Sequence, residues 1–286
     1  MEHGAERRWG RQLPPWLQDL SPRAVSAVVL ASVVLGLVYA GPTPFAGLVL
    51  IVALLMCWEW GRIVRAAVLL DAPLLVHASA VAVAVVLAAK GSAALALAAV
   101  AIGTGLVWIL CFGLNERLCA LGVLYVGVPA VALVWLRQDE PYGFRAVLFL
   151  LLIVATTDTF AYIGGRLIGG PKLWPRLSPN KTWSGLLTGV AASAIAGAVF
   201  AAFVKEAVPW TLGCTALLLG VIAQAGDLAE SALKRRFGVK DASSLIPGHG
   251  GFLDRVDGVV FAATAAALVA ILVNSQAPAR AILLWS

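Results

Sequence analysis

Long apolar runs separated by short polar connections make up most of the chain. The runs are continuous and do not alternate at period two, which excludes a membrane β-barrel and favours helices. Each run is near the roughly 20 residues that a helix needs to cross a bilayer. The pattern predicts about nine transmembrane helices, at 24–40, 45–61, 74–89, 92–112, 118–136, 145–164, 184–204, 208–229 and 258–274.

The composition agrees with this pattern. Hydrophobic residues make up 61% of the 286 positions and charged residues 13%, whereas soluble domains have roughly 45–50% and about 25%. A chain with so few polar residues needs a lipid solvent, in which helices satisfy the backbone. We therefore expect an all-α, polytopic integral membrane protein that forms one membrane domain over 1–286. Its N-terminal spans lie in 1–144, its catalytic spans and loops in 145–274, and its tail in 275–286.

The basic residues indicate the orientation of the helices. With the N-terminus inside, the predicted spans put about three quarters of the 21 lysines and arginines on the cytoplasmic side, where positive charge concentrates in membrane proteins. The net charge of +6 is explained by this asymmetry, without a nucleic-acid partner. We expect a multi-pass protein of the cell inner (plasma) membrane, with its N-terminus and polar site in the cytoplasm. Val38-Tyr39-Ala40 resembles a signal-peptide cleavage site, but we expect an uncleaved anchor.

Acidic residues are few, so the placement of Asp158 and Asp227 is informative. Asp158 lies inside the sixth span and Asp227 at the cytoplasmic end of the eighth. A charge in the bilayer costs at least ~2.5–3.5 kcal/mol on insertion scales, so such residues are functional by default. The structural alternative is a carboxylate that pairs with an arginine or caps a neighbouring helix.

A helix that continues past position 229 would place four polar side chains on one face. Asp227, Glu230, Ser231 and Lys234 are spaced i, i+3, i+4 and i+7. Two carboxylates near a hydroxyl and an ammonium suit Mg²⁺, which binds through one or two carboxylates and takes further oxygens from substrate phosphates. A solvated charged face with internal salt bridges is the alternative.

Two polar stretches between spans contain the other candidate site residues. Glycine turns let backbone N–H groups approach phosphate oxygens, and basic side chains match polyphosphates and phospholipid head groups. The stretch 230–257 combines such a turn with cations and acids: Arg235, Lys240, Asp241, His249, Gly250, Gly251, Asp254, Arg255 and Asp257. The stretch 165–183 offers Ser178, Lys181 and Thr182 as anion ligands. Binding of anionic lipid at the surface would explain the basic residues alone.

The order of these residues resembles the signature of the phosphatidate cytidylyltransferase family. The match runs without a departure through Ser231, Lys234-Arg235, Lys240-Asp241, Ser243, Pro247-Gly-His249-Gly250-Gly251 and Asp254-Arg255-Val-Asp257. The segments around Asp158, Ser178–Trp183 and Gly226-Asp227 are also similar to that family, although Ser184 replaces a longer polar residue of many members. The first five spans resemble it only in hydropathy and in Trp58-Glu59-Trp60.

The resemblance implies an all-helical homodimer with a Mg²⁺-dependent site open to the cytoplasm, and a monovalent cation such as K⁺ beside the Mg²⁺. It implies that CTP and phosphatidic acid, a membrane lipid, react to give CDP-diacylglycerol and pyrophosphate. The residues that match the family's metal ligands are Asp227 and Asp254.

We assign roles on this basis. Asp227 and Asp254 are expected to bind Mg²⁺. The residues expected to hold phosphate oxygens are Lys181, Lys234, Arg255, Ser178, Thr182, Arg235, Lys240, His249, Gly250 and Gly251. The carboxylates expected to support the metal site are Asp158, Glu230, Asp241 and Asp257. The alternatives are a CTP-dependent polyprenol kinase, a CDP-alcohol phosphotransferase, whose run of aspartates we do not find, and a transporter that uses Asp158 for ion coupling.

Overall fold

Helices make up most of the described chain. The computed structural model describes residues 15–66, 71–243, 245 and 250–286. The helices are α1 (Pro15–Ala40), α2 (Pro42–Arg65), α3 (Ala72–Ala89), α4 (Ala93–Leu110), α5 (Glu116–Gln138), α6 (Gly143–Leu167), α7 (Trp183–Phe200), α8 (Pro209–Arg236), α9 (Leu253–Asn274) and α10 (Pro278–Leu284), with a 3₁₀ turn, η1 (Ala201–Phe203), after α7.

Eight helices in the described part of the chain, α2 to α9, are long and apolar enough to cross a membrane. They coincide with eight of the predicted spans, which confirms the all-α, polytopic prediction. The ninth prediction, 24–40, falls in α1, where the part of the helix that could be assessed contains the shorter apolar segment Val28–Ala40. Several helices extend beyond the predicted spans, and two of these extensions contain site residues: α8 continues past 229 to Arg236, and α9 begins at Leu253.

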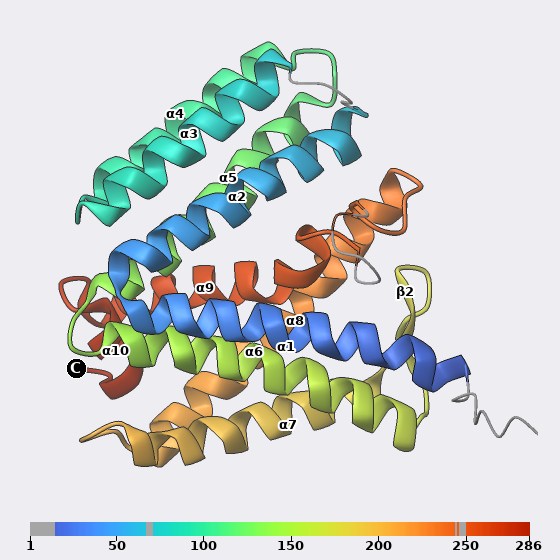
Figure 1. Cartoon of the computed structure of the whole chain (residues 1–286), viewed down its shortest axis with the longest axis vertical. Coiled ribbons are helices and arrows are strands. Elements are labelled where there is room, and N and C mark those ends of the chain that lie inside the picture. Colours follow the sequence, from blue (N-terminus) through green and yellow to red (C-terminus); the bar gives the residue numbers. More distant parts are fainter. Residues whose placement is uncertain (1–14, 67–70, 244, 246–249) are drawn as a thin grey trace, which may run out of the picture.

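The helices pack in two groups that meet at α5 and α9 (Figure 1). In the first group, α3 and α4 form an outer pair that lies on α2 and α5. In the second, α6 packs against α7 and α8, and α8 packs against α9. The short α10 lies within the predicted tail, where Ile282 and Leu283 are buried.

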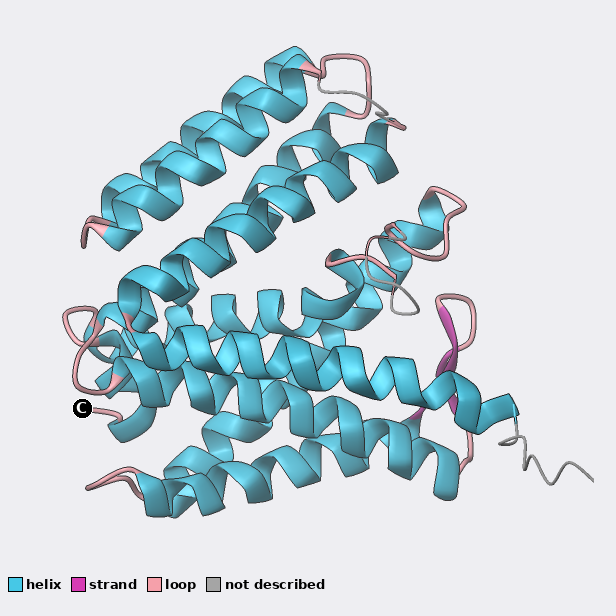
Figure 2. Ribbon diagram, viewed as in Figure 1, coloured by secondary structure: helices cyan, strands magenta, loops and turns pink. Residues whose placement is uncertain are grey.

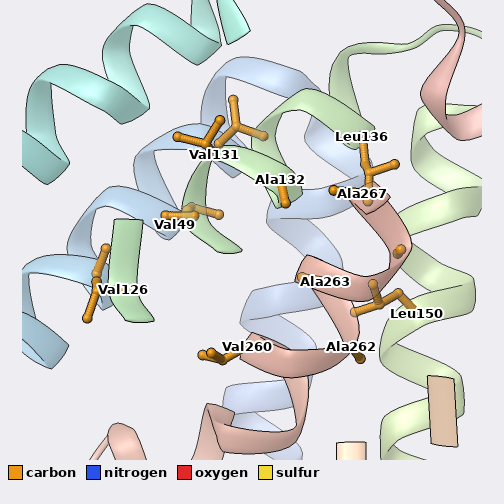
Figure 3. Close-up of a cluster of buried hydrophobic side chains, with 14 of the residues drawn as sticks. Val49, Val126, Val131, Ala132, Leu136, Leu150, Val260, Ala262, Ala263 and Ala267 are labelled. Carbon is orange, nitrogen blue, oxygen red and sulfur yellow. The ribbon is translucent and has the colours of Figure 1, made fainter. Parts of the chain in front are cut away.

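Small side chains allow α9 to approach its neighbours closely. Ala262, Ala263 and Ala267 are buried in the core beside Leu136 of α5 and Leu150 of α6 (Figure 3). Packing of small residues is a general way for helices to associate in lipid, where no hydrophobic force drives them together. The middle of α9 is therefore packed closely against α5 and α6.

One element was not expected from the sequence. The stretch between α6 and α7 contains an antiparallel hairpin of β1 (Lys172–Trp174) and β2 (Ser178–Thr182), shown in magenta in Figure 2. The Leu177 N–H closes its turn on the Trp174 carbonyl at 3.1 Å. At the end of β2 the Thr182 hydroxyl accepts the Gly185 N–H at 3.1 Å and so caps α7. The hairpin thereby fixes the position of Lys181 next to a helix start.

Candidate functional site

Both polar stretches lie at the same end of the bundle, as the predicted topology requires. The β2 hairpin, the C-terminal end of α8 and the N-terminal start of α9 come together there (Figure 1). Candidate residues that are far apart in the sequence are therefore neighbours in space. They form two charged groups, one around Lys181 and one around Lys234.

The first group joins the hairpin to α6 and α8. The Lys181 Nζ lies 2.6 Å from an oxygen of Asp227 and 3.4 Å from the Gln224 side-chain oxygen. The Gln224 amide nitrogen donates to Asp158 at 2.9 Å. Gln224 is buried and was not identified from the sequence, although an amide one turn before Asp227 within an apolar span was a detectable signal. It connects Asp158 to Lys181, which itself pairs with Asp227.

Asp257 of α9 belongs to the same region. Asp158, Asp227 and Asp257 interact electrostatically with one another, and each also interacts with Lys181. Gly226 allows α8 to approach α9 closely, because a Cβ there would lie 2.8 Å from the Asp257 carbonyl oxygen. We call Asp158, Asp227 and Asp257 the acidic cluster. Its three carboxylates carry more negative charge than Lys181 alone can balance.

The second group joins the end of α8 to the start of α9. The Lys234 Nζ lies 2.7 Å from Glu230, one turn earlier, and 2.7 Å from Asp254. Glu230 and Lys234 therefore share a helix face as predicted. They form an internal salt bridge, which is the predicted alternative to metal binding on this face. Asp254 also accepts the N–H groups of Ala242, at 3.0 Å, and Gly251, at 2.8 Å.

The predicted glycine turn is only partly described, since His249 lies outside the described residues. Gly250 has a φ of 79°, and a Cβ there would lie 2.8 Å from an Asp254 oxygen. The Gly251 N–H donates to Asp254 rather than pointing out of the loop. The two described residues of the turn, Gly250 and Gly251, therefore lie against the Asp254 carboxylate.

The remaining candidates surround these groups. Arg235, Lys240 and Asp241 are exposed after the buried part of α8, and Arg255 is exposed in the first turn of α9. Lys240 and Asp241 line an open cavity of about 460 Å³ together with Arg62 of α2. Ser178 lies in the hairpin opposite Trp174. The structure thus forms one group from Lys181, Asp158, Asp227 and Asp257. It forms a second group from Lys234, Glu230 and Asp254. The other cations, Arg235, Lys240 and Arg255, are exposed around these groups, at what we call the rim of the site.

The chemistry of these carboxylates suits a divalent cation better at Asp227 than at Asp254. Among the described residues no group of three or more His, Cys, Asp or Glu side chains is arranged to hold a metal. Mg²⁺ needs only one or two protein carboxylates when substrate phosphates complete its shell. Asp227 is 34% exposed within the acidic cluster. Asp254 is already bound to Lys234 and two backbone N–H groups, so it would have to release a partner to bind a metal.

Glu59 of α2 is a second polar residue whose role the sequence did not show. Its side chain is fully buried and accepts hydrogen bonds from the loop before α9. The signal was present, because Glu59 is an acid inside the predicted span 45–61, as Asp158 is in the sixth span.

Comparison with known proteins places the chain in a family. Residues 21–273 match the model of the Cytidylyltransferase family. A phosphatidate cytidylyltransferase of Brucella abortus is 38% identical over 247 residues, which cover 86% of this chain and 92% of that protein. A protein of the same name from Staphylococcus saprophyticus is 42% identical over 149 residues, 52% of this chain and 56% of its own length.

Proposed function

Because the chain belongs to the cytidylyltransferase family, we propose that it is a phosphatidate cytidylyltransferase, which converts CTP and phosphatidic acid into CDP-diacylglycerol and pyrophosphate. Membership of the family makes it a nucleotidyltransferase, and its helices make it a multi-pass membrane protein. The observation that carries the choice of substrates is the 38% identity to a phosphatidate cytidylyltransferase over 92% of that protein's length.

The proposed reaction needs little proton chemistry from the protein. An anionic oxygen of the phosphatidate phosphate attacks the α-phosphorus of CTP, and the bond from that phosphorus to the β-phosphate oxygen breaks. Pyrophosphate leaves with the electron pair. The nucleophile is already deprotonated, so no general base is required. The barrier comes from repulsion between the two anionic substrates, and the protein's task is to neutralise charge and align the groups.

Two lysines are placed for that task. Lys181 is held by Asp227 and Gln224, and Lys234 is held by Glu230 and Asp254, so both ammonium groups have fixed positions before substrate arrives. A preorganised cation costs less reorganisation when phosphate oxygens bind. The exposed cations at the rim, Arg235, Lys240 and Arg255, would attract the polyanionic nucleotide and the lipid head group. Ser178, Thr182 and the His249–Gly251 turn are further proposed phosphate contacts.

Mg²⁺ is the proposed cofactor, and when bound it would neutralise the nucleotide phosphates. Asp227 would hold it, with Asp254 as the second proposed ligand, and a monovalent cation such as K⁺ would lie nearby. Asp158 and Asp257 would contribute negative charge from the acidic cluster. Glu230 would keep Lys234 in place, and Asp241 would act from the rim.

The test of this function is an assay in detergent micelles with labelled CTP and phosphatidic acid. CDP-diacylglycerol and pyrophosphate should appear together and in equal amounts. A phosphorylated lipid formed together with CDP would instead identify a lipid kinase. A purified, folded protein that turns over no CTP but moves a solute across vesicle membranes would identify a transporter.

The proposed orientation can be tested with introduced cysteines. We expect cysteines at Pro175 and Lys240 to react with impermeant reagents only from the cytoplasmic face, because the positive-inside rule puts both loops there. A cysteine at Lys205, in the connection between α7 and α8, is the matched control and should react only from outside. The exposed Cys214 is replaced by serine in all three variants. Labelling of position 175 or 240 from outside intact cells would contradict the orientation.

Lys181→Ala should lower kcat/KM by about 10- to 150-fold, since a hydrogen bond to a charged group is worth about 1.5–3 kcal/mol. The expected loss follows from the position of its ammonium between Asp227 and Gln224. Lys172→Ala, at the exposed start of the same hairpin, is the control and should keep wild-type activity. Equal kcat/KM values for the two variants would reduce Lys181 to a surface lysine.

The family resemblance also implies a homodimer in the membrane, and we include this in the proposal. Many large apolar side chains on the described helices are exposed, among them Tyr39, Leu272 and Trp210. Such residues face either lipid or a second copy. Cross-linking of the protein in native membranes tests whether it is a dimer. The cross-linker is used at concentrations where a monomeric membrane protein gives no cross-link.

A further inference from the structure

Glu59 makes contacts that link α2 to a segment almost at the other end of the chain. Its carboxylate accepts the Ser243 hydroxyl at 2.5 Å and the Phe252 N–H at 3.0 Å, both at Oε1. Its other oxygen accepts the Leu253 N–H at 2.7 Å. Glu59 itself is 0% exposed. Ser243 lies within the loop between α8 and α9, Phe252 is the last residue of that loop, and Leu253 is the first residue of α9.

These hydrogen bonds stabilise both the buried Glu59 carboxylate and the start of α9. A buried carboxylate is costly unless hydrogen bonds replace its hydration, and the loop supplies three donors. Conversely, the first N–H groups of a helix have no partner within the helix, and a negative charge at that end is favourable. Leu253 is the first residue of α9. Glu59 therefore satisfies the start of α9 from outside.

The loop is packed directly against this carboxylate. A Cβ at Gly251 would lie 2.5 Å from Glu59 Oε1 and 2.8 Å from its carboxyl carbon, so only glycine fits there. The next N–H along the chain, that of Phe252, donates to Glu59, whereas the Gly251 N–H donates to Asp254. Two carboxylates, one from α2 and one from α9, thus hold adjacent peptide groups.

The Asp254 side chain is the link from this loop to the charged groups of the site. Asp254 binds Lys234 at 2.7 Å and accepts the Ala242 N–H at 3.0 Å, next to the Ser243 that Glu59 holds. A shift of the loop would therefore move Asp254 relative to Lys234. In the described part of the chain, the hydrogen-bond partners of Glu59 belong to the loop and the start of α9, so its influence on the site passes through them.

We propose that Glu59 is a positioning residue: it holds Ser243 and the first turn of α9 against α2 and thereby sets the place of Asp254 beside Lys234. The activity readout of this proposal rests on the proposed function, but its structural readout does not. It assigns the N-terminal helices a part in the site, although none of the residues expected to bind substrate lies on them.

The test compares Glu59→Gln with Glu206→Gln, an exposed glutamate in the connection between α7 and α8. Glutamine keeps the size of Glu59 but turns one oxygen into an NH₂ group, which would face N–H donors of the loop. We expect kcat to fall about 10²-fold, as a small misplacement of reacting groups can cause, with KM for CTP changed by less than about threefold. Hydrogen exchange of the Phe252 and Leu253 amides should accelerate at least about tenfold, while α3 and α4 exchange as in the wild type.

Ser243→Ala provides a second, milder variant. It removes one donor and leaves both backbone contacts, so it should shift kcat and the exchange of the same amides in the same direction but less. Combined with Glu59→Gln, it should add little, because the two residues act as one unit. Glu206→Gln should match the wild type in all readouts.

Each outcome decides a separate question. Wild-type kcat and wild-type exchange in Glu59→Gln would overturn the positioning role. If Glu59→Gln loses protection in every helix, the fold itself has failed and Ser243→Ala decides: local acceleration with reduced kcat supports the role, and no change in either contradicts it. If the wild type makes no CDP-diacylglycerol, the proposed function fails, whereas exchange at Phe252 and Leu253 still tests what Glu59 holds.

Discussion

Asp227→Asn is expected to lower kcat/KM by about two to three orders of magnitude, the scale of losing one preorganised electrostatic contact at a reaction centre. Asparagine keeps the size of the side chain and can still accept a hydrogen bond from Lys181, but it removes a negative charge from the acidic cluster. If that charge binds Mg²⁺, raising Mg²⁺ or supplying Mn²⁺ should restore part of the activity by mass action. The measurement is initial rate against metal concentration, with Glu206→Gln as control.

Asp254→Asn shows whether the two aspartates share one metal. If they do, each single variant should show the metal-dependent rescue, and the double variant should be little worse than either one. The contacts of Asp254 offer a different role for it, because it is bound to Lys234 and to the loop and need not bind the metal. Rescue of Asp227→Asn alone, with losses that multiply in the double variant, would leave Asp254 as the partner of Lys234 and contradict the shared metal.

The membrane spans could be predicted from the sequence because the bilayer imposes both their length and their apolar character. The helix ends could not be predicted in the same way. Hydropathy marks where the apolar stretch of a helix stops, and α8 and α9 continue beyond it as helices with polar side chains. The span predicted at 258–274 therefore starts five residues after α9 does, and the five omitted residues include Asp254 and Asp257. Four of the site's charged residues, Glu230, Lys234, Asp254 and Asp257, lie in these extensions.

The hairpin between α6 and α7 was missed for a different reason. Strands are recognised by alternating apolar and polar residues with β-branched or aromatic side chains. Ser178–Thr182 contains a proline and mostly polar residues, and Lys172–Trp174 is only three residues long. The expectation that Lys181 lies near the site came instead from its charge and its place in the family pattern.

Long-range partners were the least predictable part of the site. The spacing of Glu230 and Lys234 within one helix predicted their shared face, and the structure has that contact. Nothing in the sequence connects Glu59 to residues 184 to 194 positions later. A single sequence shows that a buried acid must have partners, but the fold decides which ones.

Lys234→Met should be the most damaging of the lysine substitutions in this chain. Lys234 is the cation between two carboxylates that are mostly buried, Glu230 at 2% and Asp254 at 10% side-chain exposure. Methionine keeps the length of the side chain and removes its charge, so both carboxylates lose their cationic partner. Removing one member of a buried ion pair costs about 3–5 kcal/mol. We expect a loss of thermal stability in detergent together with a loss of kcat/KM of about 10² or more.

The pattern of rescue distinguishes a buried ion group from a lysine that only attracts substrate. If Lys234→Met destabilises the protein because two carboxylates lose their cation, adding Glu230→Gln should recover stability, since it removes one buried charge. Activity should stay low, because the ammonium group is still missing. Arg236→Met, at the exposed end of the same helix, is the matched control and should change neither stability nor kcat/KM appreciably. Wild-type stability in Lys234→Met, with only KM for CTP raised, would show that Lys234 contacts substrate and is not needed to hold α8 against α9. In the Lys234→Met variant Asp254 would then be held by the loop amides alone, and the connection from Glu59 through the loop would be the main support of its position.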